Sequence, residues 1–156
     1  MEYYDFEQSV GFWLIRTAQT YERALNAELA PSGITFRQAQ VMGWLAYEGE
    51  MSQSTLADRM HIEPPTLVGI LDRMERDGWI SRHDCQNDRR KKMIRLQPQA
   101  DPAWSKILHC AKQVRARAIA GLTTDQVEKF RELLMKVQAN LSADVPAEST
   151  PATRLA

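Results

Sequence analysis

The sequence predicts a mainly α-helical protein with one small β-hairpin near its middle. Apolar residues recur at helical spacing in several segments of the chain. That spacing is interrupted between residues 79 and 96, where short stretches with strand-like alternation surround a polar run. The chain has 156 residues, of which 44% are hydrophobic, so a single domain with a real core is expected.

The first helix is expected from residue 5 to about residue 30, where Pro31–Gly33 interrupts it. Thr35 and Gln38 have the spacing of a capping box, in which the hydroxyl and the amide each bond an unpaired backbone N–H. A second helix therefore follows Thr35 and ends near Gly49. The apolar residues expected to face inward are Phe6, Val10, Trp13, Leu14, Ala18, Tyr21, Leu25 and Leu29 in the first helix, and Phe36, Val41, Met42 and Leu45 in the second.

Two shorter helices follow. Ser52 or Ser54 can cap the third, and Pro64 and Pro65 suit the first turn of the fourth, where a missing N–H costs little. Gly78 is placed to follow the end of the fourth helix. The inward residues are Leu56, Ala57 and Met60 in the third helix, and Leu67, Ile70, Leu71 and Met74 in the fourth.

The segment after Gly78 predicts a β-hairpin. Trp79–Arg82 and Met93–Leu96 are expected as two short strands, and CQNDRRKK between them as a long charged tip. From residue 82 to residue 95 the chain has six Lys or Arg and two Asp, a local charge of plus four in a chain whose formal net charge is zero. Three helices followed by such a two-stranded wing form a winged helix-turn-helix.

Two further helices are expected, one from about Ala103 to Ala120 and ended by Gly121, the other begun by a second capping box of Thr123 and Gln126. The inward residues are Trp104, Ile107, Leu108, Ala111 and Val114, and then Val127, Phe130, Leu133, Leu134, Val137 and Leu141, with Leu122 packing on Val127. A domain this small cannot easily bury the apolar faces of its first and last helices, so a partner chain is expected.

Duplex DNA is the partner that this arrangement favours. The outward residues of the fourth helix are mostly polar or small near its start, which lets a helix enter the major groove: Glu63, Pro65, Thr66, Gly69, Arg73 and Arg76. A flexible basic hairpin can follow phosphates or enter the minor groove. A charge run alone is as often a solvated turn. The two features together are far more specific than either one.

The sequence resembles the MarR family of winged-helix regulators, and within it the SlyA-like branch. The resemblance covers nearly the whole chain except the far tail, and it rests on Leu29–Pro31, Ile62–Val68, Leu71–Arg82, Asn87–Lys92 with Ile94–Leu96, and Leu122–Thr123. It implies a dimer, joined by its first, fifth and sixth helices, that binds an inverted repeat. The implied parts are dimerisation helices at 1–34 and 98–144 and a DNA-binding winged helix-turn-helix at 35–97. The tail at 145–156 is rich in Pro, Ala, Ser and Thr and is expected to be flexible.

The resemblance also implies roles for individual residues. Asp88 would orient the wing through a salt bridge, and Arg90 would enter the minor groove. Close relatives often have Arg at the position of Gly69, so base readout would differ there. The full set implied at the DNA is Glu63, Pro65, Thr66, Val68, Gly69, Arg73, Asp88, Arg89, Arg90, Lys91 and Lys92.

Members of the family often bind a small phenolic or aromatic carboxylate, which weakens DNA binding. The candidate residues are Trp13, Arg16, Met42, Trp44 and Trp104, because Arg can pair with a carboxylate while a ring stacks. Because ligand pockets are few in any protein, the residues alone favour a second interpretation, in which they are core aromatics beside one exposed Arg. The expected function is a sequence-specific transcription regulator, a repressor relieved by such a ligand.

Two other functions stay open: a dimeric protein-interaction module without sequence-specific DNA binding, and a thiol sensor through Cys85, which is near Arg82 and His83. Neither His83 with Cys85 nor His109 with Cys110 has the spacing of a closed zinc site, and no cofactor is expected. The sequence has no phosphate-binding loop, nucleophile elbow or HExxH, so no enzyme is expected. Two cysteines, no secretory-signal layout and no long apolar run favour the cytoplasm.

Overall fold

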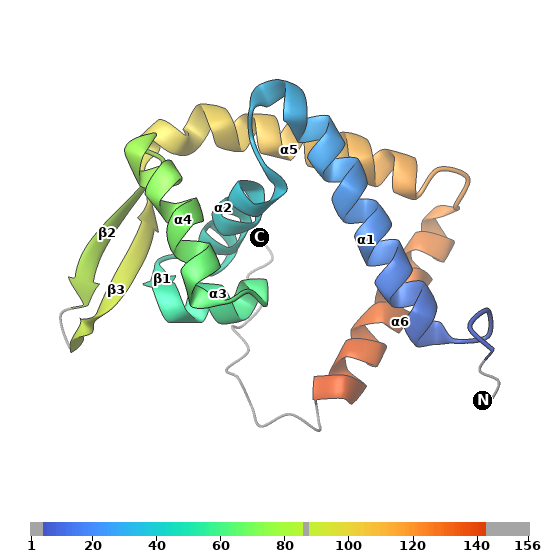
Figure 1. The fold of residues 1–156 in the computed structure, drawn as a ribbon. Helices are drawn as coiled ribbons and strands as arrows, with labels where there is room; N and C mark the ends of the chain where they lie inside the picture. The colour runs from blue at the N-terminus through green and yellow to red at the C-terminus, as the bar shows by residue number, and fades with distance from the viewer. Residues whose placement is uncertain (1–4, 86–87, 143–156) are drawn as a thin grey trace. The chain divides into compact units, whose positions relative to one another are not determined.

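The computed structural model describes residues 5–85 and 88–142, with only the backbone of Arg89 and Arg90. The chain divides into two compact units, Met1–Arg115 and Ala116–Ala156. The elements in order are α1 (Val10–Leu29), η1 (Ala30–Ser32), α2 (Phe36–Glu48), β1 (Met51–Ser52), α3 (Gln53–Met60), α4 (Pro64–Arg76), β2 (Ile80–Cys85), β3 (Asp88–Leu96), η2 (Pro98–Ala100), α5 (Asp101–Ala118) and α6 (Thr124–Ser142) (Figure 1). A mainly helical fold with a small antiparallel sheet as its wing is thus confirmed.

The helix ends follow the local signals in the sequence. The Thr35–Gln38 capping box forms with both of its hydrogen bonds, Ser52 caps α3, and Pro64 begins α4. Gly78 follows the end of α4 with a positive φ of 74°, a conformation that favours glycine. Before α6, the backbone N–H of Gln126 donates to Thr123 Oγ1 at 3.2 Å, and the N–H of Thr123 donates to Gln126 Oε1 at 2.8 Å. These predicted boundaries are confirmed.

The predicted start of the first helix, at residue 5, is wrong. Ser9 is the N-cap of α1, and its hydroxyl accepts the backbone N–H of Phe12 at 3.2 Å. The side chain of Asp5 accepts the backbone N–H groups of Glu7 and Gln8 at 3.1 and 3.3 Å instead, and so holds a turn before the helix. A short polar side chain can stabilise such a turn as readily as a helix start.

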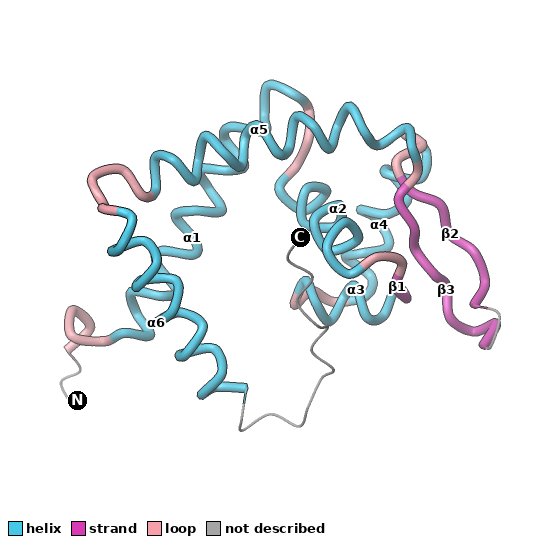
Figure 2. Tube along the Cα trace, turned by 180° about the vertical axis from the view of Figure 1, so that it is seen from behind, coloured by secondary structure: helices cyan, strands magenta, loops and turns pink. Residues whose placement is uncertain are grey.

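The sheet is larger than the predicted hairpin. Its three strands lie in the order β1-β3-β2, all antiparallel, and Figure 2 shows β2 and β3 as a long two-stranded ribbon. The two-residue strand β1 was not predicted. The strands expected at Trp79–Arg82 and Met93–Leu96 extend to Ile80–Cys85 and Asp88–Leu96, so most of the expected loop is strand. Cross-strand backbone pairing outweighs the polarity of these residues, because both faces of such a ribbon can be solvated.

The core of the first unit joins α1–α5 and the sheet. Its largest fully buried side chains are Leu29, Val41, Met42, Leu56, Leu67, Leu71, Met74 and Ile94. On α5 the prediction is partly wrong, because Leu108 is 41% exposed whereas Ala103 and Cys110 are buried. No residue of α6 is buried in the single chain, and the start of α1 is also exposed. Within residues 5–85 and 88–142, no helix is long and apolar enough to cross a membrane.

Candidate nucleic-acid interface

The first turns of α4 present an open, mostly uncharged surface. Glu63 is the N-cap of this helix, and its carbonyl accepts the backbone N–H of Thr66 at 2.9 Å. Pro65, Thr66 and Val68 are exposed, while Leu67, Ile70, Leu71 and Met74 on the other face are buried. Gly69 is half-buried, and Arg73 is exposed one turn further along. A surface without bulky side chains at a helix start allows close approach to a groove.

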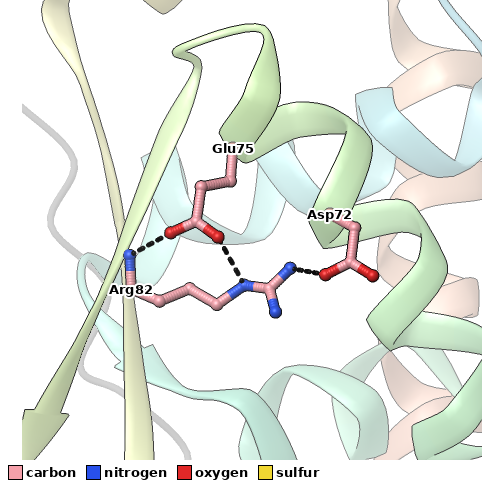
Figure 3. A network of polar contacts seen from close by, with 3 residues as sticks. All are labelled: Asp72, Glu75 and Arg82. Atoms are coloured by element: carbon pink, nitrogen blue, oxygen red, sulfur yellow. Dashed lines mark hydrogen bonds and ion pairs between the residues drawn. The ribbon is translucent and has the colours of Figure 1, made fainter.

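The wing is tied to α4 by one arginine, shown in Figure 3. The guanidinium of Arg82, in β2, pairs with Asp72, and its Nε lies 3.4 Å from a carboxylate oxygen of Glu75. The backbone N–H of Arg82 also donates to Glu75 at 3.2 Å. The side chain of Arg82 is only 18% exposed. Arg82 was counted in the basic cluster, but its charge is directed to α4, where it fixes the hairpin against the helix.

Two more cations of the basic cluster have partners within the protein. Lys92 Nζ lies 2.5 Å from Asp84 Oδ1 across the hairpin, and Arg95 Nε lies 3.6 Å from a carboxylate oxygen of Glu50. Lys91 is exposed and has no ion pair among the residues that the structure describes. The charge of plus four counted along the sequence therefore overstates what this part of the wing can direct at phosphates.

The remaining wing candidates are placed by their backbone. Arg89 and Arg90 lie in β3, and their side chains lie outside the described part of the structure. Asp88 begins β3 opposite Cys85, beside an irregularity in the strand pairing. The expected roles of Asp88 and Arg90 stay predictions.

The contacts that hold the wing against α4 were not predicted from the sequence. The ion pair of Arg82 with Asp72 and Glu75 joins residues about ten positions apart, and the sequence does contain a signal for it. Asp72 and Glu75 lie three residues apart on the outward face of a predicted helix, directly before a basic hairpin. Two acidic groups at that spacing indicate a nearby cation.

The five candidate ligand residues fall into two groups. Trp13 and Arg16 lie together on the exposed start of α1, with the Arg16 guanidinium carbon 5.6 Å from the centre of the Phe12 ring and 5.8 Å from that of Trp13. Met42 is fully buried in the core. Trp44 and Trp104 are partly buried against that core, and the Trp44 ring meets the Tyr47 ring edge-on at 6.4 Å. The structure thus joins Trp13 with Arg16 and places the other three in or against the core.

The two thiols have different surroundings. Cys85 ends β2 and is half-buried, whereas Cys110 is buried in α5 with its sulfur 3.5 Å from the carbonyl oxygen of Glu28. His83, whose spacing from Cys85 does not suit a closed zinc site, directs its Nε2 to Glu50. Within the described residues, no three His, Cys, Asp or Glu side chains are grouped as metal ligands.

Comparison with known proteins places this geometry in context. Residues 34–92 match the model of the MarR family. The matched segment contains α2, α3, α4, β2 and most of β3, and so includes α4 and most of the wing, which form the candidate interface.

Solved structures extend the similarity to most of the chain. The transcriptional regulator PA3341 is 29% identical, with a TM-score of 0.77, and the match covers 86% of this chain and 99% of that one. MarR from E. coli, in its apo form, is 25% identical with a TM-score of 0.74, covering 83% of this chain and 96% of that one. CouR from Rhodococcus jostii, bound to p-coumaroyl-CoA, is 21% identical with a TM-score of 0.74, covering 94% and 100%. A mutant of the E. coli MarR has been solved with operator DNA, and it matches at 22% identity and a TM-score of 0.74, covering 88% and 99%.

Proposed function

We propose that this chain is a MarR-family transcription regulator of the SlyA-like branch, which acts in the cytoplasm and binds an inverted-repeat site in duplex DNA as a homodimer. The observation that supports it best is the Arg82 ion pair to Asp72 and Glu75, which fixes the wing beside α4. A wing and a helix held together can contact neighbouring grooves of one duplex. The complex of an E. coli MarR mutant with operator DNA supports the same use of the fold.

In this proposal α4 supplies sequence preference and the wing supplies affinity. The exposed residues Pro65, Thr66 and Val68 meet base edges in the major groove, the valine through a thymine methyl. Arg90 enters the minor groove, with Arg89, Lys91 and Lys92 near the phosphates and Asp88 orienting the hairpin. Glu63, Gly69 and Arg73 complete the surface of α4 that faces DNA. Phosphate contacts fix position and base contacts set specificity.

The apolar face of α6 supports the dimer. Phe130, Leu133 and Leu134 are 50%, 51% and 37% exposed, and Leu141 is 66% exposed, at the i, i+3, i+4, i+11 positions of one helix. A helix with such a stripe buries it against another surface in a stable protein. We assign that surface to the corresponding helix of a second copy, with the exposed start of α1 and Leu108 of α5 in the same interface. The segments 1–34 and 98–144 are then the dimerisation parts around the DNA-binding part at 35–97.

We further propose repression that is relieved by a small phenolic or aromatic carboxylate. Arg16, lying over Phe12 and Trp13, can pair with a carboxylate while the rings stack on the ligand. Met42, Trp44 and Trp104 stay further candidates in this proposal, with Met42 fully buried and the two tryptophans packed against the core in the single chain. CouR, solved with p-coumaroyl-CoA, supports an aromatic acyl ligand in this fold. Such a ligand acts by binding better to a dimer whose two α4 helices are wrongly spaced for the operator.

Selection from a pool of random duplexes tests the proposal. We expect enrichment of a pseudo-palindrome with half-sites about one helical turn apart. Arg90→Ala should weaken binding to the enriched and the scrambled duplex by similar factors and make the salt dependence less steep. A pool that enriches no sequence would favour a protein-interaction module. Loss of binding only after peroxide treatment, rescued in Cys85→Ser, would favour the thiol sensor.

A further inference from the structure

A single carboxylate, before β1, contacts both long strands of the wing. Glu50 Oε1 lies 3.0 Å from His83 Nε2 on β2, and Glu50 Oε2 lies 3.6 Å from Arg95 Nε on β3. The next residue, Met51, pairs with Ile94 in the sheet, so the backbone holds Glu50 at the root of the hairpin. The Glu50 side chain is 34% exposed, so water screens these contacts only in part.

Side chains on both faces of β2 hold this strand, and Glu50 provides the contact on one of them. Arg82 and His83 are successive residues of the strand, and successive side chains point to opposite faces. Arg82 reaches Asp72 and Glu75 on α4, while His83 reaches Glu50 before β1. The Nδ1 atom of His83 is buried and has no hydrogen-bond partner in the described residues, so the ring makes its polar contact there with Glu50 through Nε2.

We propose that Glu50 is a positioning residue that sets the direction of the wing relative to α4 and thereby strengthens DNA binding. This inference rests on the proposed function. It predicts that DNA affinity falls when Glu50 is removed, which is opposite to the change expected from electrostatics alone. Removing a negative charge beside a basic surface strengthens phosphate binding if charge is its only effect. If Glu50 positions the wing, its removal weakens binding although the protein becomes more positive.

The test compares Glu50→Ala and Glu50→Gln with Asp58→Ala, using the full chain. Asp58 is exposed on α3, so its variant removes the same charge without touching the wing. Hydrogen exchange of the backbone amides in 80–85 and 88–96 is measured without DNA, and duplex affinity is measured in parallel. Glu50→Ala should speed exchange in the hairpin by about three- to tenfold, within the range expected for the loss of two partly screened charged contacts. Its Kd for the duplex should rise by about threefold or more, whereas Asp58→Ala should not weaken binding.

Glu50→Gln keeps the shape and an oxygen acceptor for His83 but loses the ion pair with Arg95, so its effects should lie between those of wild type and Glu50→Ala. This variant answers the question if Glu50→Ala fails to fold. Unchanged amide hydrogen exchange in the hairpin of both variants would contradict the claim that Glu50 holds the hairpin. Faster exchange with equal or tighter DNA binding would overturn its role in binding. If the wild type binds no duplex, the proposed function fails, and the exchange data still show whether Glu50 holds the hairpin.

Discussion

Gly69 offers the sharpest test of which face of α4 meets DNA. It is the sixth residue of this helix, on the same row as Pro65 and Arg73, and a Cβ built there meets no atom within 4 Å. Gly69→Ala therefore adds helix propensity without a clash. Replacing an interior helical glycine by alanine contributes about 1 kcal/mol, which raises the melting temperature by about 2–4 °C in a chain of this size.

Gly69→Arg should keep most of that stabilisation and add a cation beside the groove. Each new phosphate contact steepens log Kobs against log salt by about 0.9, hence by about 1.8 for the two copies in a dimer. Gly43, in α2, is the matched control because it too is half-buried and helical and has no neighbour within 4 Å of a built Cβ. Gly43→Arg adds the same charge elsewhere and should leave the salt slope nearly unchanged. Equal slopes for the two arginine variants, measured by fluorescence anisotropy, would refute the assignment of the α4 face.

Three other substitutions test the fold and the assembly. Arg82→Met keeps an apolar stem but leaves Asp72 and Glu75 without a cation, so the free energy of unfolding should fall by about 1 kcal/mol in thermal unfolding. Arg82→Lys should restore only part of this loss. An unchanged melting temperature of Arg82→Met would contradict the anchoring role of Arg82. His61 caps α3 with a positive φ of 49°, a conformation that favours glycine. The urea midpoint should therefore rise in His61→Gly and fall in His61→Val, where the free energy of unfolding should drop by about 1 kcal/mol. The reverse order would show that this conformation carries no strain. Phe130→Asp in α6 should yield a folded monomer by analytical ultracentrifugation, because this side chain is 50% exposed in the single chain, and a persistent dimer would exclude the α6 stripe from the interface.

The helices could be predicted because their ends depend on neighbouring residues. Local side-chain chemistry sets these ends, and it can be recognised in the sequence without knowing the fold. The examples are the capping boxes of Thr35 with Gln38 and of Thr123 with Gln126, and Gly78 after α4. The inward face of α4 followed from helical periodicity alone. Asp5 and Ser9 both suit a helix start, and only the structure shows that Ser9 is the cap.

The wing could be located but not described in detail. Strand β1 has two residues, too few for any alternation, and its pairing partner Ile94 lies over forty positions away. The residues from Arg82 to Cys85 and from Asp88 to Lys92 are polar, so no periodicity distinguishes strand from loop. The contacts of Glu50 with His83 and Arg95 depend on where the sheet brings those residues. A count of charges along the chain cannot show which cations are already paired.

The central claim is that α4 and the wing bind a specific duplex. The most direct measurement is fluorescence anisotropy of the purified chain on duplexes tiling the DNA upstream of its own gene, with a scrambled duplex as control and a salt series. We expect tight binding to one tile, at two chains per duplex, with affinity that falls steeply as salt rises. Salicylate should release that complex if Arg16 and the neighbouring rings hold an aromatic carboxylate. Absence of binding to every duplex at low salt would contradict the claim.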